Sequence, residues 1–229
     1  MIQAIFFDFN GVIIDDEPLQ MAAYRDILSE YGIALTESDY YGSLGMDDKT
    51  FVQAAFQRAE LKLTDDVLES VLADKEVRHR KLIGDELPLF PGVVTFLKAN
   101  ARQRSLGLVS MATKSEVNYV LNRAHLQLFT VMVTTEDVNV CKPAPDCYRL
   151  AFERLNEKRR SKQLPPLMGS ECLVIEDSPP GIEAGRLAGL RTLGVTNTVS
   201  AEQLRAAGAE VVTASLADWT VDAVTHVFR

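Results

Sequence analysis

The fold prediction starts from the stretch IQAIFFDFNG at residues 2–11. Residues 2–7 are mostly apolar and carry no charge, which predicts a short buried β-strand. The polar segment from Asp8 to Gly11 then ends this strand in a turn. Because no basic residue precedes the strand and an acid follows it at once, the segment favours a strand over a secretory signal peptide.

Downstream of residue 88, short apolar runs alternate with segments of helical spacing. Strands are expected at residues 105–109, 131–133, 172–175 and 192–195. Helices are expected at residues 92–101, 114–124, 144–156 and 181–188. This alternation predicts an α/β fold with a doubly wound parallel sheet. Ligands of such sheets bind at the carboxyl ends of the strands.

The segment between these two regions has helical spacing and no strand pattern. Leu19, Ala23 and Ile27 are examples of its apolar positions, and Gly32 is a plausible helix end. We therefore expect two parts. Residues 1–15 and 88–229 would form the α/β core, and residues 16–87 would form a small all-helical insertion hinged near Asp15 and Pro88.

Composition restricts the classes of partner. The chain has 229 residues, 47% of them hydrophobic, which is enough to bury a core in one or two domains. Its net charge of −8 disfavours nucleic acid and anionic membrane surfaces as partners. No apolar run approaches the ~18–20 residues that span a bilayer. The basic segment at residues 157–169 is interpreted as a solvated helix end and loop.

The three cysteines are Cys141, Cys147 and Cys172, an odd number without metal-ligand spacing. They indicate reduced thiols in a cytoplasmic protein. We expect the protein to be a monomer or a weak dimer.

Polar side chains gather where the predicted strands end. They are Asp8, Asn10, Ser110, Lys142, Glu176 and Asp177. Without a counter-charge, the three carboxylates at one sheet edge would repel one another and raise each other's pKa. A divalent cation with oxygen ligands relieves this repulsion, and Mg²⁺ fits best.

Four motifs occur in a fixed order along the chain. They are Asp8-Phe9-Asn10-Gly11-Val12, the strand that ends Gly107-Leu108-Val109-Ser110, Lys142-Pro143-Ala144-Pro145, and Glu176-Asp177-Ser178-Pro179. Their order and spacing resemble the haloacid dehalogenase superfamily, and within it the β-phosphoglucomutase-like branch of phosphatases and mutases. This branch has a helical cap between its first and second motifs, where residues 16–87 lie here.

The resemblance implies a role for each motif residue. Asp8 would attack phosphorus and form an aspartyl-phosphate. Mg²⁺ would bind to Asp8, Asp177 and the main-chain carbonyl of Asn10, with Glu176 close by. Ser110 and Lys142 would bind phosphoryl oxygens of a small phosphorylated substrate.

Asn10 departs from the family pattern, which has a second aspartate at this position. That aspartate protonates the leaving group and then activates water, and a neutral amide can do neither. Three interpretations remain open: an engineered trap, a slow or differently assisted native phosphatase, and a protein that binds phosphate esters without turnover.

The cap of this branch supplies substrate specificity. The segment Gly42 to Lys49 resembles its substrate-facing loop, so Lys49 is a candidate for substrate binding. Lys75 falls where the mutase has a functional lysine, but an ordinary solvated lysine on a helix face is the favoured interpretation. Gln20 and Asp16 replace a histidine and a threonine of the mutase, and an acid at the mouth of the site disfavours a bisphosphate intermediate.

The sequence thus predicts an Mg²⁺-dependent hydrolase of a small phosphate monoester, such as a sugar phosphate. A phosphomutase and a catalytically weak phosphate-ester-binding protein are the alternatives.

Overall fold

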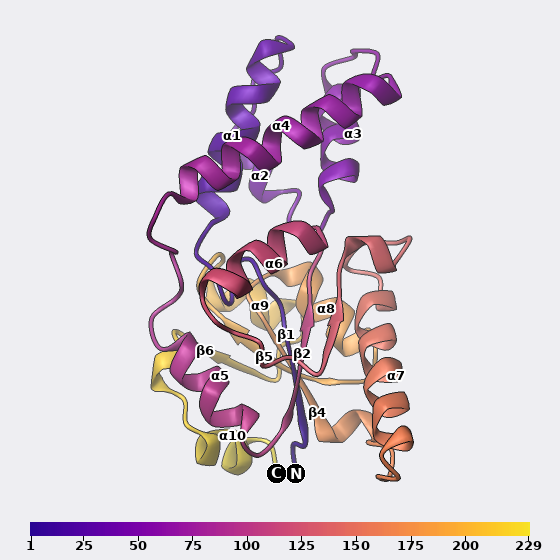
Figure 1. Ribbon diagram of the computed structural model, residues 1–229. Coiled ribbons are helices and arrows are strands. Elements are labelled where there is room, and N and C mark those ends of the chain that lie inside the picture. The colour runs from indigo at the N-terminus through magenta and orange to yellow at the C-terminus, as the bar shows by residue number, and fades with distance from the viewer.

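The computed structural model describes all 229 residues. Its centre is one parallel sheet of six strands in the order β3-β2-β1-β4-β5-β6. The strands are β1 (Ala4–Phe7), β2 (Ser105–Val109), β3 (Val131–Val133), β4 (Cys172–Glu176), β5 (Arg191–Val195) and β6 (Val211–Thr213). Helices lie on both sides of this sheet (Figure 1), so the α/β doubly wound fold is confirmed.

The helices that flank the sheet follow the strands in sequence. They are α5 (Val93–Ala101), α6 (Lys114–Arg123), α7 (Asp146–Ser161), α8 (Pro179–Leu187), α9 (Ala201–Ala206) and α10 (Val221–Val227). Side chains of α5, α6 and α10 join one apolar cluster, and those of α7 and α8 join another. The two clusters cover opposite faces of the sheet.

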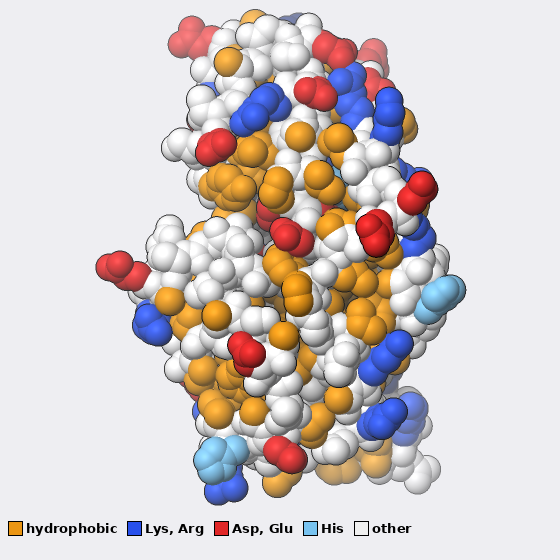
Figure 2. Space-filling view, turned by 90° about the vertical axis from the view of Figure 1, so that its left-hand side faces the viewer, with side chains coloured by type: hydrophobic (Ala, Val, Ile, Leu, Met, Phe, Trp, Pro, Cys, Tyr) orange, Lys and Arg blue, Asp and Glu red, His pale blue; other side chains and the backbone are white.

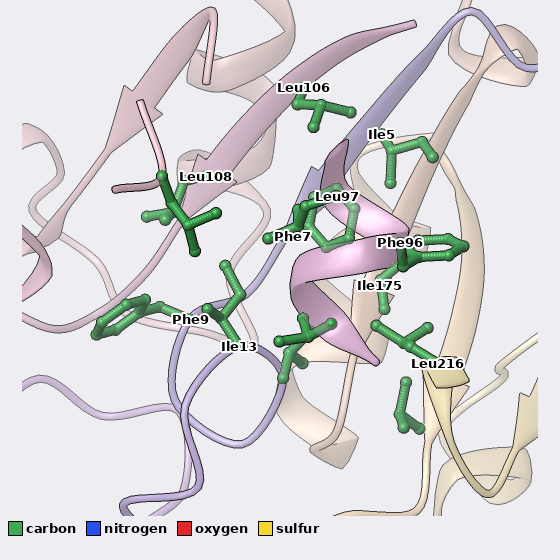
Figure 3. Close-up of a cluster of buried hydrophobic side chains, with 14 of the residues drawn as sticks. Ile5, Phe7, Phe9, Ile13, Phe96, Leu97, Leu106, Leu108, Ile175 and Leu216 are labelled. Carbon is green, nitrogen blue, oxygen red and sulfur yellow. The ribbon is translucent and has the colours of Figure 1, made fainter. Parts of the chain in front are cut away.

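The sequence of β1 shows why both faces are covered. Successive side chains of a strand point to opposite faces. Ile5 and Phe7 accordingly belong to the cluster with α5, whereas Ala4 and Phe6 belong to the cluster with α7. Figure 3 shows Phe7 next to Phe96 of α5, and the two ring centroids are 6.1 Å apart. Burying one such ring contributes ~1.5–3 kcal/mol, so β1 is an anchor of the core.

Residues between positions 15 and 88 form helices and no strand. The main helices are α1 (Glu17–Glu30), α2 (Glu37–Tyr41), α3 (Asp48–Arg58) and α4 (Asp65–Ile83). They have their own apolar cluster of 13 residues, with Tyr24, Phe51 and Val71 among them. Figure 1 shows this helical unit at one end of the molecule, beyond the sheet, and both termini at the other end.

The two chain segments that connect the helical unit to the sheet run side by side. The Asp15 amide donates a hydrogen bond to the Pro88 carbonyl (2.7 Å), and Ile14 pairs with Leu89 in an antiparallel bridge. We call α1–α4 the cap from here on. The expected strand at residues 2–7 is shorter, beginning at Ala4, and β6, α9 and α10 were not predicted.

The molecular surface carries mixed charge. On the face drawn in Figure 2, acidic and basic side chains are interspersed, and neither sign dominates. No helix in the structure combines the length and the apolarity that are needed to cross a membrane.

Candidate active site

The strand register brings the first and fourth motifs together. Phe7 of β1 lies opposite Ile175 of β4, so Asp8 and Glu176 come next at the same edge of the sheet. One ligand oxygen from each of Asp8, Glu176 and Asp177 lies within 4.8 Å of the others. The expected convergence of the three carboxylates is therefore present in the structure.

Two glycines make this close approach sterically feasible. Gly11 has a φ of 73°, and a Cβ atom there would lie 1.9 Å from Oδ2 of Asp177. A Cβ atom on Gly181 would lie 2.0 Å from the carboxylate carbon of Glu176. Ser178 caps α8 by accepting a hydrogen bond from the Gly181 amide, which fixes the turn that carries Asp177.

Lys142 lies between two of the carboxylates. Its Nζ is 2.9 Å from Oδ1 of Asp8 and 2.6 Å from Oε1 of Glu176, and its side chain is 2% exposed. Burial disfavours the charged ammonium group, but these two carboxylates outweigh burial and raise the pKa of Lys142. Lys142 is therefore a fixed cation beside Asp8.

Glu176 is fully engaged with protein donors. Its Oε1 accepts hydrogen bonds from Lys142 and the Tyr148 hydroxyl (2.7 Å), and its Oε2 accepts from the Ser178 hydroxyl (3.1 Å) and the Asp177 amide (3.3 Å). The residue is 0% exposed. These bonds suit Glu176 for holding Lys142 and leave little of its carboxylate for direct metal ligation.

The other two carboxylates lack sufficient positive charge around them. Burial and then Glu176 raise the pKa of Asp8 to about 7, although Lys142 opposes the rise. Burial, Glu176 and Asp8 raise the pKa of Asp177 well above its usual range. A hard divalent cation between Asp8 and Asp177 would remove this deficit, so the donor set fits Mg²⁺.

Asn10 lies at this edge with its amide directed to Asp16. The Asn10 Nδ2 donates to both carboxylate oxygens of Asp16, each at 3.0 Å. Asp16 is 0% exposed and also lies 3.0 Å from Nε2 of His79. The prediction that Asp16 is an acid at the mouth of the site is therefore wrong: it is buried behind Asn10.

Above the sheet edge is a cavity with about 730 Å³ of empty space, part of which opens to solvent. Asp8, Asn10, Lys142 and Asp177 form its floor, and cap residues form its roof. The cap residues are Glu17, Gln20, Tyr24, Tyr40, Ser43, Leu44, Gly45, Met46, Asp47, Asp48, Phe51 and Lys75.

Two predicted binding residues lie outside the wall of this cavity. Ser110 is fully buried, its Oγ accepts a hydrogen bond from the Ala112 amide (3.0 Å), and Met111 and Ala112 line the wall instead. Lys49 is exposed at the start of α3 and lines a separate cavity with Glu76 and Glu136. Asp47 and Asp48 line both cavities, whereas Lys49 lines only the second one.

The structure also differs from the prediction for Lys75. It is not a solvated lysine: its side chain is 2% exposed, and its Nζ lies 2.8 Å from Asp48 and 2.6 Å from Glu116 of α6. The sequence contains a pattern that indicates burial at position 75. The buried residues of α4 are Leu68, Val71, Lys75, His79 and Ile83, which follow helical spacing.

A parallel sheet with an acidic cluster and a buried lysine at its carboxyl edge lies beneath a helical cap. The family model of haloacid dehalogenase-like hydrolases matches residues 2–189. The chain belongs to this family.

Its similarity to characterised relatives extends over most of the chain. The phosphorylated carbohydrates phosphatase of Thermotoga maritima is 30% identical over 202 residues, which cover 87% of this chain and 88% of that protein. The fructose-1-phosphate phosphatase YqaB of Escherichia coli is 27% identical over 194 residues, covering 83% and 95%. The crystal structure of a β-phosphoglucomutase from Clostridium difficile shares the fold, with a TM-score of 0.84, 22% identity, and coverage of 100% and 97%.

Proposed function

We propose that this protein is an Mg²⁺-dependent phosphatase that hydrolyses a small phosphate monoester, of the sugar-phosphate type, through an aspartyl-phosphate on Asp8. The observation that carries the proposal is the floor of the cavity. Asp8 is the most exposed of its carboxylates, at 13% of its side chain, and Lys142 lies beside it. Two relatives with phosphatase names, both for carbohydrate phosphates, support the substrate class.

In this proposal, Asp8 attacks phosphorus, the bond between phosphorus and the leaving oxygen breaks, and the leaving oxygen takes a proton from water, because Asn10 cannot supply one. Bound Mg²⁺ would neutralise charge on the phosphoryl group so that an anionic carboxylate can approach it. Asp8, Asp177 and the main-chain carbonyl of Asn10 would hold the ion. Lys142 binds a phosphoryl oxygen and stabilises the charge that develops there. Water then cleaves the phosphorus–oxygen bond to Asp8 and releases phosphate.

The cap is proposed to act as a unit, residues 16–87, that closes over the floor and excludes bulk water. Its loop already meets the core closely: a Cβ atom on Gly45 would lie 2.8 Å from the ring of Pro180. Asp47 also accepts hydrogen bonds from Thr135 and Cys141 of the core, each at 3.2 Å.

Two buried free cysteines and one half-buried one support a reducing, cytoplasmic compartment.

Turnover of an aryl phosphate with and without Mg²⁺ tests this function. We expect Mg²⁺-dependent release of phosphate that is lost in Asp8→Asn. We also expect Mg²⁺ to raise the melting temperature of the unchanged chain and not that of Asp177→Ala. An equal Mg²⁺ effect on the Asp177→Ala variant would contradict the metal assignment.

One specific observation favours a second candidate, a phosphate-ester-binding protein with weak catalysis. Asn10 cannot carry a proton, and its amide is held by Asp16. Mg²⁺-dependent binding of phosphate without any turnover would identify this case.

The product formed from a hexose 1-phosphate distinguishes a phosphatase from a mutase. Free sugar indicates a phosphatase, and an isomeric phosphate indicates a mutase.

A further inference from the structure

We infer that the cavity selects the monophosphate of a small polyhydroxylated compound and rejects a substrate with a second phosphate. The inference rests on the proposed phosphatase function and specifies the substrate class of the same site. It depends on the cap side of the cavity, where the leaving group would lie.

The cap wall of the cavity has more acidic than basic side chains. Asp47 and Asp48 contribute two carboxylates to it, and Glu17 adds a carboxyl group whose pKa burial raises to about 7, whereas Lys75 is its one cation. Lys75 is already paired, because its Nζ contacts both Asp48 (2.8 Å) and Glu116 (2.6 Å). A second phosphate would bring ~1.5–2 negative charges to this wall. It would have to take Lys75 from two carboxylates and leave them without a counter-charge, which is unfavourable in a buried place.

The cap wall also holds a hydrogen-bond acceptor that no protein group satisfies. Gln20 is 6% exposed and lines the cavity. Its Nε2 donates to Asp16 (3.2 Å), which fixes the amide and leaves its Oε1 without a hydrogen-bond partner. Buried polar atoms are nearly always satisfied by protein, water or ligand. A hydroxyl group of the substrate would supply the missing donor.

Two tyrosines extend the polar wall. The Tyr24 hydroxyl is buried without a well-formed hydrogen bond. Burial, and then the nearby Asp48, raises the pKa of Tyr24 well above its usual range, so this hydroxyl stays neutral and lies within reach of the Asp48 carboxylate. The Tyr40 hydroxyl donates to Oε2 of Glu17 (2.6 Å), and both residues line the cavity. Carboxylate, amide and phenol oxygens together match the hydroxyl donors of a polyol.

Equilibrium binding to the unchanged chain tests the inference, because Asn10 cannot carry the proton that turnover needs. Isothermal titration calorimetry in Mg²⁺ would compare fructose 1-phosphate with fructose 1,6-bisphosphate, and glucose 1-phosphate with glucose 1,6-bisphosphate. We expect each monophosphate to bind ~10-fold or more tightly than its bisphosphate, the order of effect of a single unfavourable charge contact. Equal affinities, or tighter bisphosphate binding, would overturn the inference.

Two variants locate the effect. Asp48→Asn removes one partner of Lys75 and should shift the preference toward the bisphosphate by ~10-fold. Its matched control is Asp66→Asn, an exposed carboxylate on α4 that should leave the preference unchanged. Gln20→Met keeps the side-chain length and should weaken monophosphate binding by a larger factor than it weakens inorganic phosphate binding. An unchanged preference in Asp48→Asn would contradict the role of Lys75.

Binding of inorganic phosphate distinguishes a failure of the selectivity from a failure of the proposed function. If it binds in an Mg²⁺-dependent manner and the sugar mono- and bisphosphates do not differ, the phosphatase site stands and the selectivity is wrong. If inorganic phosphate does not bind at all with Mg²⁺, the proposed function itself fails, and the inference with it.

Discussion

At the scale of single residues, Asn10 decides how fast the proposed reaction runs. General acid–base catalysis is worth ~10²–10⁴-fold, and the side chain of Asn10 cannot contribute to it. We expect Asn10→Asp to raise kcat by ~10²-fold or more with little change in KM. The new carboxyl group would face Asp16 at about the 3.0 Å that now separates Nδ2 from it, and this repulsion would help to keep it protonated.

Steady-state turnover of an aryl phosphate at saturating Mg²⁺ measures this effect. Asn10→Ala is the matched control and should remain as slow as the unchanged chain. Equal kcat values for Asn10→Asp and the unchanged chain would mean that another group already supplies the proton.

Glu17 gives a pH-dependent prediction. Burial and then Asp16 raise the pKa of Glu17 from 4.5 to about 7. A carboxyl group with a raised folded-state pKa stabilises the fold below its unfolded pKa, and this contribution is lost as the pH rises toward the folded pKa. Metal-free protein should therefore lose stability between about pH 4.5 and pH 7 through Glu17.

Glu17→Gln removes this ionisation and keeps an oxygen that accepts from Tyr40. We expect the variant to gain ~1–2 kcal/mol relative to the unchanged chain on going from pH 5 to pH 7.5, a discounted value for a group that is not fully buried. Urea unfolding in EDTA at both pH values measures the change. A constant difference between the two proteins would contradict the prediction.

At the scale of elements, the turn after β1 requires glycine for two reasons. Gly11 combines a φ of 73° with contact to Asp177, whereas Gly32 has a φ of 75° and nothing within 4 Å of an added Cβ atom. Gly32→Ala should cost only the ~1–2 kcal/mol of left-handed backbone strain. Gly11→Ala should cost more and should also abolish the Mg²⁺-dependent rise in melting temperature, because it displaces Asp177. Similar losses in both variants, with the Mg²⁺ effect retained, would contradict this role of Gly11.

At the scale of the whole molecule, Lys75 links the cap to the sheet domain. Its partner Glu116 belongs to α6, whereas Lys75 and Asp48 belong to the cap. Lys75→Met leaves both carboxylates without their cation, and breaking a buried pair in this way costs ~3–5 kcal/mol. Arg78→Met, on the same helix, removes a surface pair with Glu30 and should cost less than ~1 kcal/mol. Urea unfolding compares them, and equal losses would contradict the linking role of Lys75.

The sequence alone determined five of the six strands, four of the six flanking helices and the floor of the site. Alternating apolar strands and helices force a parallel sheet, and Asp8, Glu176 and Asp177 immediately follow strands that pair in register. Their convergence therefore follows from local sequence positions. The short edge strand β6 was not predicted, and its three residues are only half-buried.

Only the tertiary structure decided the roof of the cavity. Whether Lys75 and Lys49 face the site depends on how α3 and α4 pack above the sheet, and here the packing buries Lys75 and exposes Lys49. The burial of Asp16 likewise depends on a distant segment, because Nε2 of His79 in α4 lies 3.0 Å from its carboxylate. The sequence pattern predicts where each strand ends. Which charged and hydrogen-bonding groups meet across the interface between the cap and the sheet domain depends on how these two parts pack in three dimensions.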